Sequence, residues 1–221
     1  MTFILNVLHK DMSILAADQK AVAEWPSILG FPSRGKAVFH GHKKITMNST
    51  GVLAIAMSGY SPHHAYIGEV ESSESINEGL SIIRNYMEEF LLVEDRTSLI
   101  KSASPFENEC VASFYDEDTQ SFFTNEFCFN EFSNSTRLHR ANEKVKVFCA
   151  GSGRIYFDSE SGKAEAQSLA EENGGSSMPD IFISWMEEVF KRVSAKDEGC
   201  GAEAIFVVST RKDHEFRPGR R

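Results

Sequence analysis

The sequence predicts an α+β fold in which two antiparallel sheets stack on each other between helices, a four-layer αββα sandwich. Short apolar segments alternate with long amphipathic patterns in the order strands, helix, strands, helices, strand. The first two of these segments are separated by only two residues, which permits nothing but an antiparallel hairpin. The 221 residues include 41% hydrophobic and 25% charged side chains, a composition typical of one globular domain spanning 1–221.

The first predicted hairpin brings the two ends of its strands together. Residues 3–9 (FILNVLH) and 12–17 (MSILAA) are the strands, and Lys10-Asp11 is the turn. Because the strands run in opposite directions, Thr2 before the first strand and Asp18 after the second lie at the same end. We therefore expect their side chains to lie within contact distance.

A second hairpin is predicted after an irregular segment. Residues 19–36 contain several Pro and Gly residues, so we expect no single regular element there. Strands follow at 37–47 and 52–58, on either side of the turn sequence Asn-Ser-Thr-Gly. This hairpin ends at Gly59.

The first helix is predicted over 76–93. Ser75 and Glu78 have the spacing of a capping box, in which each side chain satisfies a backbone N–H of the other residue. The apolar side chains that recur at helical spacing are Ile76, Leu80, Ile83, Met87 and Leu91. Their common face is expected to pack on a sheet.

The second half of the chain repeats the order of strands and helices. Strands are predicted at 109–116, 120–127, 144–150 and 202–210, and helices at 163–172 and 179–195. A polar stretch at 130–144 is expected to be irregular, and Gly-Ser-Gly-Arg at 151–154 predicts a sharp turn. The basic tail at 211–221 is expected to be solvated, with docking on a neighbouring subunit as the alternative.

Composition excludes several classes of function. The net charge of −9 argues against nucleic acid or an anionic membrane as the main partner. The sequence has neither a signal-peptide pattern nor an apolar run of about 18 residues, so we expect a cytoplasmic protein. The cysteines are too widely spaced for a zinc site and are expected to be free thiols. No residue pattern indicates a metal or a cofactor, and no nucleophile elbow is present.

Thr2 is the candidate nucleophile. If Met1 is removed, this residue carries a hydroxyl and a free α-amine, whose reference pKa of about 7.7–8.0 suits a base near neutral pH. A lysine beside the hydroxyl would lower the hydroxyl pKa, and an aspartate would hold that lysine in position.

Four motifs then follow in the order found in proteasome β-subunits and their bacterial relative, the HslV peptidase. The segments ILAADQKAV at 14–22, HKKITMNSTGVLAIAMSG at 42–59, AGSG at 150–153 and DEGCG at 197–201 each resemble a family motif. The resemblance covers nearly the whole chain. It implies the N-terminal-nucleophile hydrolase fold, homo-oligomeric stacked rings, unfolded polypeptide substrates and an ATPase unfoldase as a possible partner.

The resemblance also assigns roles to residues. Thr2 would be the nucleophile, and the N–H of Gly59 would donate to the oxyanion. Lys44 would lie beside the Thr2 hydroxyl, and Asp18 would hold Lys44 in position. Lys43 is the alternative to Lys44. Ser152 and Asp197 would form a polar network around the α-amine. Cys200 stands where the family has a serine, and a thiol is the weaker hydrogen-bond donor.

Some alternatives remain open at the level of sequence. Asp18 and Ser152 can be turn residues, and Asp197 can be a helix C-terminal acid. Three segments are longer than in the family: the connection from Asp18 to Lys44, the insertion at 128–143 and the stretch from Ser152 to Asp197. A catalytically silent ring or scaffold protein that retains Met1, and a stand-alone amidase of the same fold, are the alternatives to a threonine peptidase.

Overall fold

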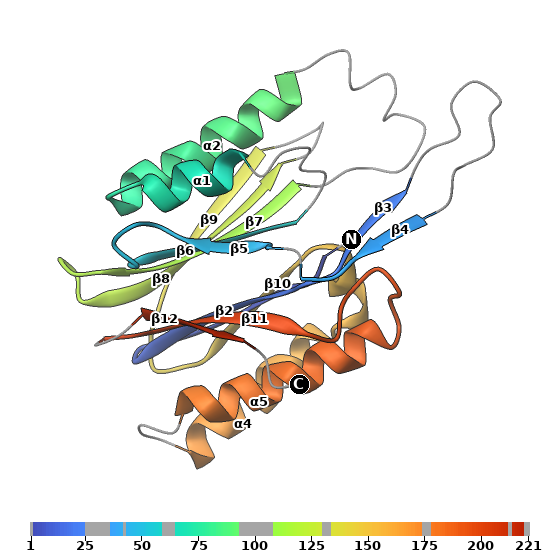
Figure 1. Ribbon diagram of the computed structural model, residues 1–221. Coiled ribbons are helices and arrows are strands. Elements are labelled where there is room, and N and C mark those ends of the chain that lie inside the picture. Colours follow the sequence, from blue (N-terminus) through green and yellow to red (C-terminus); the bar gives the residue numbers. More distant parts are fainter. Residues whose placement is uncertain are drawn as a thin grey trace.

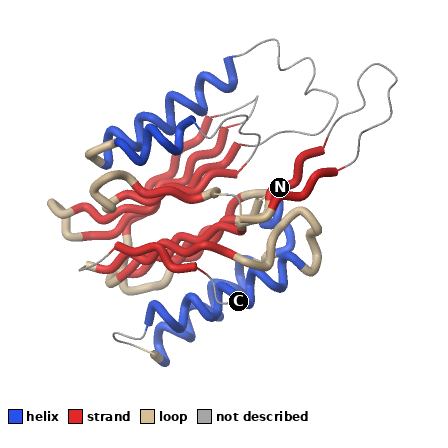
Figure 2. Tube along the Cα trace, in the orientation of Figure 1, coloured by secondary structure: helices blue, strands red, loops and turns tan. Residues whose placement is uncertain are grey.

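The computed structural model describes residues 2–24, 36–41, 43–58, 65–92, 108–129, 134–173, 178–211 and 214–218. Within these residues the chain forms two five-stranded antiparallel sheets, one further two-stranded hairpin and four α-helices (Figure 1). The two large sheets face each other and helices lie on the outer side of each, so that Figure 2 shows two strand layers between two helix layers. The predicted α+β arrangement of two antiparallel sheets with helices outside is confirmed.

The first sheet has the strand order β10-β1-β2-β11-β12. Its strands are β1 (Ile4–His9), β2 (Met12–Asp18), β10 (Lys146–Ala150), β11 (Ala204–Thr210) and β12 (His214–Pro218). In the predicted first hairpin, Ile4 pairs with Ala17 and His9 with Met12. Thr2 and Asp18 therefore lie at the same end of the sheet, as expected.

Every residue of β1 and β2 is buried because both faces of these strands are covered. Phe3, Leu5 and Val7 belong to the core cluster shared with the C-terminal helices, α4 (Ser159–Glu172) and α5 (Met178–Ser194). The intervening Ile4 belongs to the cluster between the two sheets. A strand buried on both faces has no apolar–polar alternation, which explains the continuous apolar runs near the N-terminus.

The second sheet has the strand order β5-β6-β7-β8-β9. Its strands are β5 (Ile45–Met47), β6 (Leu53–Ser58), β7 (Asn108–Asp116), β8 (Ser121–Phe129) and β9 (Asn134–Arg140). Helices α1 (Ala65–Ser72) and α2 (Ile76–Leu92) cover its outer face and share a core cluster with it. The apolar face predicted for the first helix contributes Ile83 and Met87 to this cluster.

Two strands of the large sheets were not expected from the sequence, and both lie at the edge of a sheet. β9 occupies part of the polar stretch at 130–144, and β12 occupies part of the basic tail. Leu138 in β9 is 60% exposed, which shows how little apolar surface this strand buries. An edge strand is held mainly by pairing with one neighbour, so its sequence need not show the alternation that predicts a strand.

The predicted strand at 37–47 divides into two. Its first part belongs to a separate hairpin of β3 (Ala21–Glu24) and β4 (Lys36–Phe39), which projects beside the N-terminus in Figure 1. Its second part is β5 in the second sheet. Gly41 lies between them with φ of 73°, a left-handed conformation that interrupts an extended strand. The strand β3 lies in the segment 19–36, for which no single regular element was expected, and the helix α1 was likewise not predicted.

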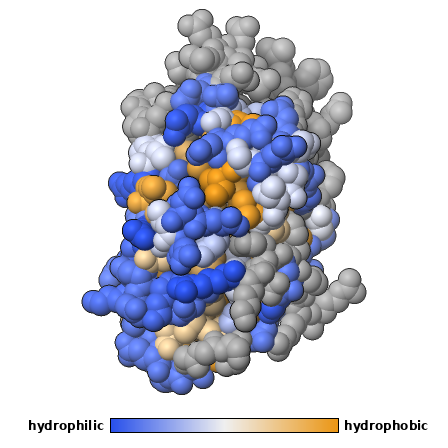
Figure 3. Space-filling view, turned by 90° about the vertical axis from the view of Figure 1, so that its left-hand side faces the viewer, coloured by the Kyte–Doolittle hydropathy of each residue, from blue (hydrophilic) through white to orange (hydrophobic). Residues whose placement is uncertain are grey.

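Figure 3 shows the end of the sandwich that lies away from the N-terminus. Hydrophilic side chains cover most of this face, and hydrophobic ones gather near its middle. No helix in the described ranges is both long enough and apolar enough to cross a membrane.

Candidate active site

The candidate nucleophile Thr2 lies at the end of the first sheet, between the start of β1 and the end of β2. The N–H of Phe3 donates to Asp18 Oδ1 at 2.8 Å, and the N–H of Asp18 donates to the Phe3 carbonyl at 3.1 Å. These bonds extend the hairpin by one residue pair and hold Thr2 beside Asp18. Thr2 itself is only 5% exposed.

Asp18 is a fully buried carboxylate that accepts hydrogen bonds from four donors. Phe3 N and Lys44 Nζ approach Oδ1 at 2.8 and 2.9 Å. Gly201 N and Lys20 N approach Oδ2 at 2.9 and 3.2 Å. Several donors together offset the cost of removing a charge from water. Asp18 therefore joins the start of β1, the end of β2, the segment before β11 and Lys44.

The structure distinguishes Lys44 from its neighbour Lys43. Lys44 is 7% exposed and points to Asp18, and its ammonium also donates to the Lys20 carbonyl. Lys43 points to the other side, where it pairs with Glu71 of α1 near the surface. Burial lowers the pKa of Lys44 below its usual range, while the charge of Asp18 opposes this shift. Of the two lysines, Lys44 is the one that joins the candidate site.

Ser152 contacts the backbone of Thr2 from the turn that follows β10. Its hydroxyl oxygen accepts from Thr2 N at 3.3 Å and lies 3.4 Å from both the Thr2 carbonyl oxygen and Asp197 Oδ2. The N–H of Gly153 also donates to the Thr2 carbonyl, at 3.3 Å. Ser152 thus lies where the sequence places it, next to the nitrogen that becomes an α-amine if Met1 is removed.

Asp197 and Cys200 complete this side of the network. The thiol of Cys200 lies 3.2 Å from Asp197 Oδ2 and 3.9 Å from Ser152 Oγ. Burial and the nearby carboxylates raise the pKa of Cys200 to about 12, so this thiol stays protonated near neutral pH. It can act as a weak donor to Asp197 but not as a thiolate nucleophile.

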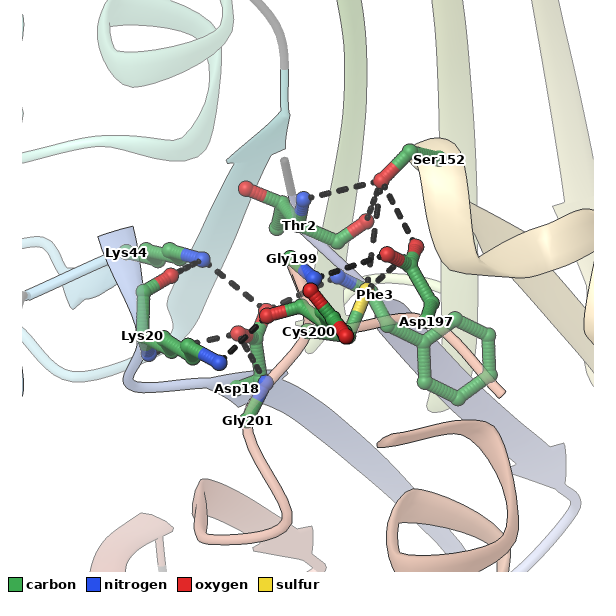
Figure 4. A network of polar contacts seen from close by, with 11 residues as sticks. Thr2, Phe3, Asp18, Lys20, Lys44, Ser152, Asp197, Gly199, Cys200 and Gly201 are labelled. Atoms are coloured by element: carbon green, nitrogen blue, oxygen red, sulfur yellow. Dashed lines mark hydrogen bonds and ion pairs between the residues drawn. The ribbon is translucent and has the colours of Figure 1, made fainter. Parts of the chain in front are cut away.

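Figure 4 shows the two halves of the site on opposite sides of Thr2. Ser152, Asp197 and Cys200 lie on one side, near the Thr2 backbone. Lys44 and Asp18 lie on the other, and the Thr2 side-chain oxygen points away from Ser152 toward that side. The hydroxyl and the backbone nitrogen of one residue therefore face different groups of partners.

The structure brings together six of the seven site residues predicted from the sequence. These are Thr2, Asp18, Lys44, Ser152, Asp197 and Cys200. The seventh, Gly59, lies outside the described residues, directly after β6 in the sequence.

Backbone groups in the site could not be predicted from residue types. The carbonyl of Lys20 and the N–H of Gly201 are the clearest examples, because any residue could supply them. Gly201 has little space around it, since an added Cβ would lie 3.0 Å from Lys20 Cβ.

The described residues contain no group of three or more His, Cys, Asp or Glu side chains that could hold a metal ion. Comparisons with protein-family models and with curated proteins find no match to this chain.

Proposed function

We propose that this protein is a threonine peptidase that uses Thr2, after removal of Met1, to hydrolyse peptide bonds. The observation that carries the proposal is the convergence of two kinds of partner on this one residue. Ser152 accepts a hydrogen bond from its backbone nitrogen and is itself bound by Asp197, and the buried Lys44–Asp18 ion pair lies on the side of its hydroxyl. A residue that is both nucleophile and base needs these two environments.

In the first half of the proposed reaction, Thr2 Oγ1 attacks the carbonyl carbon of the scissile bond while its proton passes to the α-amine. The positive charge of Lys44 stabilises the developing alkoxide. By resemblance, the N–H of Gly59 donates to the oxygen of the tetrahedral intermediate. The C–N bond then breaks, the α-ammonium returns the proton to the leaving amine, and an ester links Thr2 to the acyl half of the substrate.

In the second half, a water molecule attacks this ester. The α-amine accepts a proton from the water and returns it to Thr2 Oγ1 as the ester bond breaks. The acid product leaves and the hydroxyl and amine are regenerated. Ser152 keeps the amine oriented through both halves, and Asp197 holds Ser152.

The wider biological role is proposed from the resemblance of the four sequence motifs to proteasome β-subunits and HslV. The stacked sheets between helix layers are compatible with the N-terminal-nucleophile hydrolase fold of that family. We therefore propose a subunit of a homo-oligomeric ring complex in the cytoplasm. Its substrates would be unfolded polypeptides, delivered by an ATPase unfoldase.

The decisive test combines the mass of the chain with turnover of a fluorogenic peptide. We expect the intact mass to correspond to a chain that begins at Thr2, and we expect the wild type to release the fluorophore. Thr2→Ala should reduce kcat by at least about 10³-fold because it removes the nucleophile. Thr2→Ser, which keeps a hydroxyl and an α-amine, should retain measurable turnover.

The outcomes separate the alternatives. Retention of Met1 together with absent turnover would contradict the proposal and favour a silent ring or scaffold protein. Turnover that survives Thr2→Ala would place the chemistry elsewhere. The mass in solution then distinguishes a ring of many subunits from a stand-alone amidase.

A further inference from the structure

Glu109 of β7 is a buried carboxylate that the proposed reaction does not use. The residue is 8% exposed, and its two oxygens bind two groups from the turn that follows β10 in the other sheet. Oε2 accepts from the N–H of Gly151 at 2.5 Å, and Oε1 is paired with the guanidinium of Arg154. A carboxylate at this depth costs free energy unless it is paired. The N–H of Gly151 and the guanidinium of Arg154 supply this pairing, and both residues lie within two positions of Ser152 in the sequence.

The turn that Glu109 binds is packed directly against Thr2. Gly151 has φ of 86°, and a Cβ added there would lie 2.2 Å from the Thr2 carbonyl oxygen. Ser152 accepts from Thr2 N at 3.3 Å, and Gly153 donates to the Thr2 carbonyl at 3.3 Å. Three consecutive residues of the turn therefore touch Thr2, and Glu109 binds the backbone N–H of the first of them.

We infer that Glu109 is a positioning residue for the active site, an inference that rests on the function proposed above. Its carboxylate binds Gly151 and Arg154 and so holds the turn at residues 151–154 in place. This turn positions Ser152 at the α-amine of Thr2. Glu109 does not touch the substrate. Its contribution is to the geometry of the turn and to the charge near the amine.

The charge contribution has a definite sign. Glu109 supplies a negative charge that stabilises the ammonium form of Thr2, and Arg154 supplies a positive charge that opposes it. Other charged or titratable side chains bind Phe3, the chain neighbour of Thr2, or the direct partners of Thr2 and Phe3: Asp18, Lys44, Asp197 and Cys200. Lys20 binds Asp18 through its backbone N–H, and its ammonium donates to the Glu198 carbonyl. The variants below leave all of these residues in place.

The test uses two variants with opposite expected shifts. Glu109→Gln keeps an oxygen for the N–H of Gly151 but removes the negative charge, so the pKa of the Thr2 α-amine should fall. Arg154→Gln removes the positive charge, so that pKa should rise. General loosening of the turn would shift both variants in the same direction. The pKa is measured by the pH dependence of acylation of the Thr2 α-amine, followed by mass spectrometry of the N-terminal peptide, in full-length chains that begin at Thr2.

Glu165 of α4 offers a matched control. Its carboxylate also binds one N–H group and one arginine: Trp185 Nε1 at 2.8 Å and Arg192 at 3.1 Å. These partners lie on α5, outside the candidate site. Glu165→Gln should leave both the titration of the Thr2 α-amine and the peptide turnover unchanged.

Kinetics give the second measurement. Glu109→Ala removes the acceptor of the Gly151 N–H, and we expect kcat to fall by about 10²-fold because the amine is displaced from its working geometry. KM should stay unchanged, since Glu109 makes no contact with the substrate. The rising limb of the pH profile of kcat/KM should move to lower pH in Glu109→Gln and to higher pH in Arg154→Gln.

The results can overturn the inference independently of the proposed function. Equal titration of the Thr2 α-amine in wild type, Glu109→Gln and Arg154→Gln would refute the positioning role, as would shifts of the same sign. If Glu109→Ala does not fold, the other two variants still decide. Opposite shifts in a chain that hydrolyses no peptide would support the positioning role and reject the peptidase.

Discussion

At the scale of single residues, the two neighbouring lysines show how the fold gives two identical side chains different environments. Lys44 and Lys43 are identical in chemistry and adjacent in sequence. One forms a buried ion pair with Asp18, and the other forms a surface pair with Glu71. Only the buried pair lies in low dielectric, where charges interact strongly and unpaired charges are costly.

This difference predicts the stability of two matched variants. Lys44→Met leaves the buried Asp18 without its cation and should lower the free energy of unfolding by about 3 kcal/mol. Lys43→Met removes a partly exposed pair and should lower it by less than about 1 kcal/mol. Urea denaturation of the purified wild type and variants measures both losses. Equal losses would mean that the Lys44–Asp18 pair is not buried as described.

Cys200 is a second example at this scale. The thiol occupies the place of a donor to Asp197, within reach of Ser152, but its hydrogen bonds are weaker than those of a hydroxyl. The sequence already predicted Cys200 as a site residue, because the DEGCG motif resembles a family motif. The raised pKa could not be read from the sequence, because it follows from burial beside Asp18 and Asp197.

At the scale of elements, the turn between β10 and α4 has the strictest geometry in the site. The short 3₁₀ helix Ser152–Tyr156 begins there, directly after Gly151. The left-handed φ of Gly151 and the closeness of Thr2 exclude any side chain at this position. In the Gly-Ser-Gly sequence, the first glycine is therefore required for steric reasons, and the serine supplies the hydroxyl that contacts Thr2.

Two glycine substitutions test this reading. Gly151→Ala combines an unfavourable φ with a clash against the Thr2 backbone and should cost about 3 kcal/mol or more. Gly68 in α1 has open space around it, so Gly68→Ala should raise stability by about 0.5–1 kcal/mol through its better helix propensity. Thermal and urea unfolding measure both changes. A neutral Gly151→Ala would contradict the described packing of the turn on Thr2.

At the scale of the whole molecule, the two sheets are joined by polar as well as apolar contacts. Ser13 of β2 and Ser113 of β7 form a buried hydrogen bond of 2.6 Å across the sandwich. Thr124 of β8 donates to Asn6 of β1 at 2.7 Å, and Asn6 also donates to Ser13 at 3.1 Å. Because a displaced sheet would leave these groups unpaired, the network specifies how the sheets sit on each other.

A double-mutant cycle on the two serines measures this contribution. Ser13→Ala and Ser113→Ala should each lower the free energy of unfolding by about 1–2 kcal/mol, since each removes the buried hydrogen bond between the two sheets. The double variant should lose less than the sum, with a coupling energy of about 1 kcal/mol. Strict additivity would show that the two hydroxyls do not stabilise each other across the sheets.

The sequence by itself determined the central strands and the two long amphipathic helices α2 and α5. It also predicted five residues of the candidate site without an alternative residue: Thr2, Asp18, Ser152, Asp197 and Cys200. These features depend on local patterns: apolar runs, helical spacing, a two-residue turn and short motifs. The sequence also predicted that Thr2 lies beside Asp18, because a two-residue turn permits only an antiparallel hairpin of β1 and β2.

Only the tertiary structure decided the remainder. The edge strands β9 and β12 form because a neighbouring strand offers its free N–H and C=O groups, which no local pattern records. Contacts between segments that are distant in sequence determine that Lys44, rather than Lys43, pairs with Asp18. They also bring the Glu109 carboxylate to the N–H of Gly151. Burial and pairing of charges are properties of the packed molecule, and they determine which polar residues can act on Thr2.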